Sequence, residues 1–287
     1  MKEVLLLISN VDDIVAQYPQ VFDYHEGDKY KILLTDYSSV EIKTGNGIKL
    51  YCRGKEVNIP DAFYIKTGNN DAFILENLLL QAGAESVINM DEVRVARSKI
   101  ITYNRLAANG IRVPETYVFF NHPDEDILRE KFSYPFVIKP DNGFGGEGVK
   151  LIHNDKELSD YLDSLEYGVA YVAQEYISTS KGKDVRVVMY NSEVLFSIMR
   201  SSTNPDEFRS NVHVGGEILD YPIDDDTVKL CKKIAGLFDL PVIGIDLMIG
   251  NGEFVVAEIN SSPGITGGKD AVIMNEIIQK FFENKEK

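Results

Sequence analysis

The sequence predicts an α/β protein of the mixed α+β type, in which a small N-terminal domain precedes a larger one. Short strands rich in β-branched residues alternate with amphipathic helices along the 287 residues. A glycine-rich hairpin is expected at residues 135–152, and a hairpin with one polar face at residues 246–260. A chain of this length buries enough apolar surface to fold without a disulfide or metal staple.

The amino-acid composition and net charge exclude some classes of binding partner. The net charge is −15, and an acidic field repels nucleic acid and anionic lipid, so neither is an expected partner. Of the two cysteines, Cys52 and Cys231, the second lies on the apolar stripe of a predicted helix, as a buried structural thiol would. The apolar run Val4–Ile8 is too short for a signal peptide, and no later run is long enough to span a membrane, which predicts a cytoplasmic protein.

Residues 1–90 are expected to form a small α/β domain. Its predicted helix covers residues 71–82, and its predicted strands cover residues 4–9, 30–34, 38–43, 47–51, 62–66 and 87–89. The region has neither metal-ligand spacing nor a nucleophile paired with a base. It is therefore interpreted as a scaffold or a substrate-side domain.

A single helix is predicted at residues 91–109, with Lys99 off its apolar stripe. A strand at 116–120 and a helix at 123–132 follow, and then the glycine-rich hairpin. Its loop carries Gly143, Gly145, Gly146 and Gly148, whose backbone N–H groups can close over phosphate oxygens, and Lys139 stands at its base. The spacing fits neither a Walker loop nor a Rossmann fingerprint, because a strand follows. A flexible hairpin with an incidental lysine is the alternative.

The next segments suggest a nucleotide pocket. A helix at 155–166 and a strand at 169–173 lead into Gln174-Glu175-Tyr176-Ile177, where a carboxylate and an apolar pair with free backbone groups would suit a purine and its ribose. Strands at 184–190 and 194–200 follow. Three arginines, Arg186, Arg200 and Arg209, then form the cationic cluster that this acidic chain otherwise lacks.

After a helix at 224–238, the last hairpin joins a strand at 242–249 to a second strand through Asn251-Gly252. Alternation places Val256, Glu258 and Asn260 on one face and Val255, Ala257 and Ile259 on the other. A three-residue loop would set Asp246 opposite Glu258, whereas a two-residue loop would set it opposite Ala257. Two carboxylates and an amide at one point suit Mg²⁺, with room for water and phosphate. The alternative is a solvated edge hairpin. A helix to about residue 283 ends the chain.

These blocks, in this order, resemble the ATP-grasp superfamily and, within it, the RimK-like carboxylate–amine ligases, over roughly residues 93–280. The most specific block is Phe208–Gly216, followed by Asp246 and Glu258-Ile-Asn260. The resemblance implies an ATP-grasp domain at 91–287, with a lid subdomain at about 110–173 and a C-terminal subdomain at about 174–287, after a pre-ATP-grasp domain at 1–90. Ser98, where the RimK group tends to have Asp, and the loop 141–148 depart from the pattern and leave the substrate open.

The resemblance also implies site residues. The implied ATP contacts are Lys99, Lys139, Gly143, Gly145, Gly146, Gly148, Gln174, Glu175, Tyr176, Ile177, Asp184, Arg209, Ser210 and Asn211. The implied ligands of Mg²⁺, with Mn²⁺ as an alternative ion, are Asp246, Glu258 and Asn260. The implied catalytic residues are Arg200 and Arg209, which would steady an acyl phosphate.

The implied function is an ATP-dependent carboxylate–amine ligase that forms an amide through an acyl phosphate. It would use ATP, an amino acid such as glutamate or another amine, and a carboxylate on a peptide, protein or metabolite; homo-oligomer formation is compatible with this reading. One alternative is a macrocyclising peptide ligase of the same superfamily. The other is a regulatory protein that binds nucleotide without catalysis. The acceptor, and an amide against an ester product, stay open.

Overall fold

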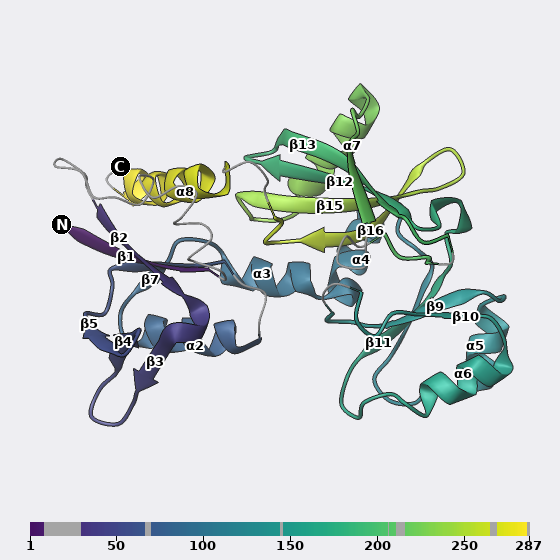
Figure 1. Ribbon diagram of the computed structural model, residues 1–287, viewed down its shortest axis with the longest axis horizontal. Coiled ribbons are helices and arrows are strands. Elements are labelled where there is room, and N and C mark those ends of the chain that lie inside the picture. Colours follow the sequence, from purple (N-terminus) through teal and green to yellow (C-terminus); the bar gives the residue numbers. More distant parts are fainter. Residues whose placement is uncertain are drawn as a thin grey trace. The chain divides into compact units, whose positions relative to one another are not determined.

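The computed structural model describes residues 1–8, 30–66, 70–143, 146–205, 207–210, 216–264 and 269–285. The chain divides into two compact units, Met1–Met90 with Gly264–Lys287, and Asp91–Pro263 (Figure 1). The C-terminal helix α8 (Lys269–Lys285) therefore groups with the N-terminal residues, although the sequence analysis assigned it to the domain 91–287. The reason is local packing: Phe282 stacks on Tyr30 at 5.4 Å between ring centroids, and Asp270 pairs with Lys66 at 2.5 Å.

The first unit contains a parallel four-stranded sheet. Its strands, in spatial order, are β2 (Tyr30–Asp36), β1 (Lys2–Ile8), β6 (Ala62–Lys66) and β7 (Glu85–Ser86). The central strand β1 is buried from Val4 to Ile8, as its uninterrupted apolar sequence predicts. Helix α2 (Asn70–Gln81) belongs to the same unit. The strand expected at 87–89 lies earlier, at β7.

A small antiparallel sheet completes this unit. It consists of β3 (Val40–Lys43), β4 (Lys49–Cys52) and β5 (Lys55–Val57). The expected strand 38–43 begins only at Val40, because residues Tyr37–Ser39 form a 3-10 turn. Asp36 caps that turn by accepting a hydrogen bond from the Ser38 N–H at 2.8 Å.

The second unit begins with two helices, not the single helix expected at 91–109. Helix α3 (Met90–Arg97) and helix α4 (Lys99–Ala108) are separated by Ser98, which has an extended backbone. Its hydroxyl accepts a hydrogen bond from the Ile101 N–H at 3.2 Å and so caps α4. The break makes Lys99 the first residue of a helix.

The first sheet of this unit is antiparallel. Its order is β10 (Lys150–Ile152), β9 (Phe136–Pro140), β11 (Tyr171–Glu175) and β8 (Thr116–Phe119). Helices α5 (Glu125–Lys131) and α6 (Asp155–Leu162) cover one face, where Phe136 and Ile138 pack against Leu128 and Leu158 (Figure 1). Alternation along β9 turns Val137 and Lys139 to the other face.

The second sheet has five antiparallel strands. Its order is β14 (Gly216–Asp220), β13 (Glu193–Ser202), β12 (Lys183–Tyr190), β15 (Val242–Ile249) and β16 (Phe254–Asn260). Strand β14 was not expected. The short helix η3 (Ser178–Ser180) precedes β12, and helix α7 (Asp225–Ala235) buries Cys231 against one face of the sheet, as predicted for this thiol.

In the β15–β16 hairpin Asp246 pairs with Glu258, but the loop length differs from the one that was expected to produce this pairing. Its loop has four residues, because Ile249 pairs with Phe254, and that register alone would place Asp246 opposite Ala257. A β-bulge at Ala257 shifts the ladder by one residue, so Asp246 pairs with Glu258. The expected faces were wrong at Val256 and Ala257: Val256 lies in the core with Ile259, whereas Ala257, which was expected in the core, is only half-buried and lies outside that cluster.

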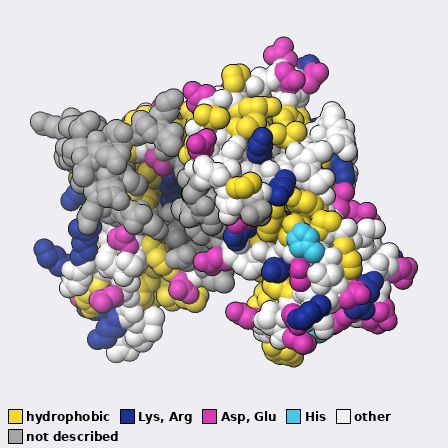
Figure 2. All heavy atoms as spheres, turned by 45° about the vertical axis from the view of Figure 1, so that its right-hand side comes forward, with side chains coloured by type: hydrophobic (Ala, Val, Ile, Leu, Met, Phe, Trp, Pro, Cys, Tyr) yellow, Lys and Arg dark blue, Asp and Glu magenta, His cyan; other side chains and the backbone are white. Residues whose placement is uncertain are grey.

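The surface is mixed in charge. Lys and Arg side chains are interspersed with Asp and Glu over the face drawn in Figure 2. Among the described residues, no helix combines the length and the apolar content needed to cross a bilayer.

Candidate nucleotide and metal site

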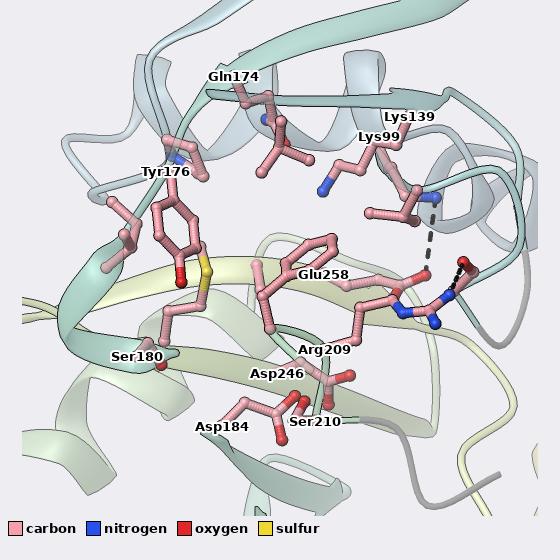
Figure 3. Close-up of a pocket in the computed structure, with 18 of the residues that line it drawn as sticks. Lys99, Lys139, Gln174, Tyr176, Ser180, Asp184, Arg209, Ser210, Asp246 and Glu258 are labelled. Carbon is pink, nitrogen blue, oxygen red and sulfur yellow. Dashed lines mark hydrogen bonds and ion pairs between the residues drawn. The ribbon is translucent and has the colours of Figure 1, made fainter. Parts of the chain in front are cut away.

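A cavity of about 170 Å³ lies between the two sheets of the second unit (Figure 3). It brings together residues from elements far apart in sequence. Strand β9 and the loop after it line one side, the segment after β11 lines one end, and β12, β15 and β16 line the other side. Most residues implied by the resemblance line it: Lys99, Lys139, Gly143, Gly146, Gln174, Glu175, Tyr176, Ile177, Asp184, Arg200, Arg209, Ser210, Asp246 and Glu258.

Asp246 is the most buried carboxylate of the site. Its side chain is 4% exposed and accepts two hydrogen bonds from Arg186, both at 2.7 Å, and one from Arg200 at 2.8 Å. Burial raises the pKa of Asp246, but the two guanidinium groups outweigh burial, so that its pKa lies below the ordinary value. A carboxylate has about four acceptor positions. One position, on Oδ1, is therefore left for a metal ion.

Glu258 and Asn260 complete the expected ligand set. Glu258 lies 3.9 Å from the Lys99 ammonium, and its side chain is 43% exposed toward the cavity (Figure 3). Asn260, two residues along the same strand, uses its Oδ1 to accept the Ser262 N–H at 2.9 Å and is not among the residues that line the cavity. The described residues hold no group of three or more His, Cys, Asp or Glu side chains placed to bind a metal ion. Two carboxylates and an amide still fit Mg²⁺, which takes few protein ligands beside phosphate and water.

Lys99 lies at the N-terminus of α4, where a cation opposes the helix dipole. Asp141, at the base of the glycine loop, offsets this unfavourable interaction of the Lys99 ammonium with the helix dipole. Its carboxylate accepts the Ile100 N–H at 2.8 Å and the Ser98 hydroxyl at 3.1 Å, and its backbone carbonyl accepts the Lys99 ammonium at 3.0 Å. Lys99 is consequently buried, not a solvated surface lysine.

Lys139 faces the cavity from β9. Its ammonium donates to the phenol oxygen of Tyr103 at 3.1 Å, and the Tyr103 hydroxyl donates to the Ala257 carbonyl at 2.5 Å. Burial lowers the pKa of Lys139 to about 8, an effect that Glu258 partly opposes. A buried ammonium with few partners is well suited to a phosphate ligand.

The glycine loop approaches its neighbours closely. A Cβ at Gly143 would lie 3.3 Å from the Pro140 ring and 3.9 Å from the Lys99 ammonium, and Gly148 has a φ of +66°. The Gly146 carbonyl accepts a hydrogen bond from Arg209, which is labelled in Figure 3, at 3.1 Å. Arg209 is also paired with Glu207 at 2.8 Å. Gly145 lies outside the described residues.

The end of β11 and the residue after it hold their side chains in different ways. Gln174 donates to the Thr116 hydroxyl at 2.7 Å, and Glu175 pairs with Arg112 at 2.5 Å. The Tyr176 hydroxyl is buried and has no hydrogen-bond partner among the described residues.

The expected arginine cluster is matched by carboxylates. Arg200 forms a buried ion pair with Asp184 and also contacts Asp246, and Arg186 pairs with Asp246. Burial raises the pKa of Asp184, and hydrogen bonds from Arg200 and Ser210 oppose that effect. Asn211 lies outside the described residues.

Sequence reasoning missed several residues that shape the site. The missed residues are Tyr103, Asp141, Val137, Phe208 and Met248. Tyr103 could have been found, because it lies four residues after Lys99 and therefore shares its helical face both in the expected helix 91–109 and in α4. The Asp141 contact links residues 43 positions apart, which no local pattern encodes.

Residues 96–281 match the family model described as the RimK-like ATP-grasp domain. The chain is 28% identical over 247 residues to N-acetylaspartylglutamate synthase A of Homo sapiens, covering 82% of this chain and 62% of that protein. It is 30% identical over 247 residues to a probable alpha-L-glutamate ligase of Stutzerimonas stutzeri (strain A1501), covering 82% and 81%. The chain thus spans less than two thirds of the human synthase.

Solved structures share the fold. D-alanine–D-alanine ligase from Bacillus anthracis, complexed with ATP, superposes with a TM-score of 0.67 at 18% identity, over 100% of this chain and 99% of that one. The RimK domain ATP-grasp protein of Sphaerobacter thermophilus gives 0.66 at 17% identity, over 97% and 98%. On its sequence match and its fold, the chain belongs to the RimK-like ATP-grasp family.

Proposed function

We propose that this chain is an ATP-dependent carboxylate–amine ligase. The observation that carries the proposal is the convergence, on one cavity beneath a glycine loop, of two lysines and of two carboxylates on neighbouring strands. A purely nucleotide-binding protein would not need the buried Asp246, with one open acceptor position, beside the more exposed Glu258. The relatives named as glutamate ligases and synthases support the same reaction class.

In the proposed reaction, a carboxylate oxygen of one substrate attacks the γ-phosphorus of ATP. The bond from that phosphorus to the β–γ bridging oxygen breaks, and ADP leaves. The amine nitrogen of the second substrate then attacks the carbonyl carbon of the acyl phosphate, phosphate leaves with the electrons of the carbon–oxygen bond, and the nitrogen loses a proton. The product is an amide.

The residues of this chain would bind and orient rather than react covalently. Lys99 and Lys139 would offset phosphate charge, and Arg209 would hold the glycine loop near the phosphates through Gly146. Mg²⁺, held by Asp246, Glu258 and Asn260, would supply further charge neutralisation at the phosphates. Closure of the loop over the acyl phosphate would exclude water.

We propose an α-amino acid such as glutamate as the amine substrate, because relatives of this chain are named for glutamate addition. The carboxylate substrate would be a peptide, a protein or a small metabolite.

The test is the release of ADP and phosphate from Mg·ATP across a panel of amino acids, amino-acid pairs and short acidic peptides. Stimulation by glutamate with one carboxylate partner, together with loss of turnover in Lys139→Ala, is the expected result. Turnover that needs one intact precursor peptide and no free amino acid would favour a macrocyclising ligase. Tight Mg·ATP binding without turnover on any substrate would favour the regulatory alternative.

A further inference from the structure

Tyr103 lies at the meeting point of the two sides of the cavity, although the proposed reaction assigns it no role. It is four residues after Lys99 on α4, so both side chains lie on the same helical face. Its side chain is almost fully buried, at 3% exposed. Helix α4 packs against β16, the strand that carries Glu258.

The phenol oxygen of Tyr103 joins strand β9 to strand β16. It accepts the Lys139 ammonium from β9 at 3.1 Å and donates to the Ala257 carbonyl of β16 at 2.5 Å. The Lys139 ammonium lies 5.6 Å from the centre of the Tyr103 ring, on the side of the hydroxyl. Lys139 thus contacts the tyrosine through its phenol oxygen.

Ala257 is the extra residue of the bulge that sets Asp246 opposite Glu258. A bulged residue is left out of the regular ladder, so its backbone groups need other partners. The Tyr103 hydroxyl supplies one partner. The same hydroxyl therefore contacts both the bulge that sets the carboxylate pair and the lysine that faces it.

We propose that Tyr103 is a positioning residue for nucleotide binding: its phenol oxygen fixes the Lys139 ammonium relative to the bulged strand of Asp246 and Glu258. The lysine and the carboxylate pair then meet a phosphate in a set geometry. The inference rests on the proposed binding of ATP at this cavity. The competing reading is that the hydroxyl only satisfies the Ala257 carbonyl, and that Lys139 is placed by β9 alone.

A double-mutant cycle separates the two readings. Mg·ATP affinity is measured by calorimetry for the wild type, Tyr103→Phe, Lys139→Ala and the double variant. Tyr171→Phe is the matched control, because it removes the hydroxyl of a buried tyrosine that does not line the cavity; within the described part of the chain this hydroxyl accepts the Glu166 N–H at 3.2 Å. Melting temperatures are recorded for all five proteins.

We expect Tyr103→Phe to weaken Mg·ATP binding by up to about tenfold, because the Lys139 side chain, no longer held by the phenol oxygen, would have to be ordered when the phosphate binds. In the Lys139→Ala background the same substitution should change the affinity less than twofold, and Tyr171→Phe should also change it less than twofold. The hydrogen bond from Tyr103 to the Ala257 carbonyl contributes to fold stability whether or not Lys139 is present. Its loss should therefore lower the melting temperature equally in both backgrounds.

An equal loss of affinity in both backgrounds, or no loss in either, would overturn the positioning role while leaving the proposed function intact. Failure of the wild type to bind Mg·ATP would instead overturn the proposed function, and this inference with it.

Discussion

Glu258→Gln and Asp246→Asn should both abolish Mg²⁺-dependent ATP binding, but only the second should destabilise the fold. Glu258 is 43% exposed and its nearest cation, Lys99, is 3.9 Å away, so its neutralisation should change the free energy of unfolding by less than about 0.5 kcal/mol. Asp246 is 4% exposed and receives three charge-assisted hydrogen bonds. An amide there would point a donor at the guanidinium groups.

The magnitude follows from the buried charges. Removing one partner of a buried ion pair destabilises a protein by about 3–5 kcal/mol, because the remaining charge is left uncompensated. Arg186 and Arg200 both lose a partner in Asp246→Asn, although Arg200 keeps Asp184. We expect a loss of about 3 kcal/mol, which lowers the urea midpoint by about 1.5 M if the slope is about 2 kcal/mol/M.

The assay pairs urea unfolding with calorimetry of ATP in the presence and absence of Mg²⁺. Glu253→Gln is the matched control, because Glu253 lies on the same hairpin, is 63% exposed and should change neither measurement. Retention of Mg²⁺-dependent binding by Glu258→Gln would refute the metal assignment. A wild-type urea midpoint in Asp246→Asn would refute the stabilising role of its ion pairs.

Two further predictions concern single groups in the cavity. Because burial lowers the pKa of Lys139 to about 8, its ammonium loses its proton as the pH rises through that value. Mg·ATP affinity, measured by calorimetry, should therefore fall about tenfold between pH 7 and 9. The affinity of a Lys139→Ala variant should not change over that interval. Tyr176→Phe removes a buried hydroxyl that has no partner among the described residues and should raise the free energy of unfolding by about 1 kcal/mol, whereas Tyr167→Phe, at a residue 95% exposed, should not; a destabilised Tyr176→Phe would mean that the hydroxyl is in fact satisfied.

The elements that have a repeating local sequence pattern could be predicted from the sequence. The buried strand β1, the glycine loop and the lysine facing the cavity from β9 all follow from apolar runs, period-two alternation and clustered glycines. The pairing of Asp246 with Glu258 was expected only on condition of a three-residue loop. The structure reaches the same pairing with a four-residue loop and a bulge.

The break between helices α3 and α4 at Ser98 shows why other features could not be predicted from the sequence. Serine is tolerated inside helices, so nothing local distinguishes one helix over 91–109 from two. The decision depends on Asp141, whose carboxylate accepts hydrogen bonds from the Ile100 N–H, 41 residues away, and from the Ser98 hydroxyl, 43 residues away. The buried position of Lys99 depends on the same contact and could not be predicted either.

The charge balance of the cavity also differs from the expectation, and the difference bears on the role that we propose for Mg²⁺. Three arginines were expected to attract ATP to an acidic protein, but Arg186, Arg200 and Arg209 are each matched by a carboxylate. Among the described residues that line the cavity, five cations face five carboxylates, so the cavity has no net positive charge. A triphosphate alone would find no net attraction there. A complex of the triphosphate with a divalent ion would be attracted to the cavity. The ion would reduce the charge of the phosphates and would bind the acceptor positions left on Asp246 and Glu258.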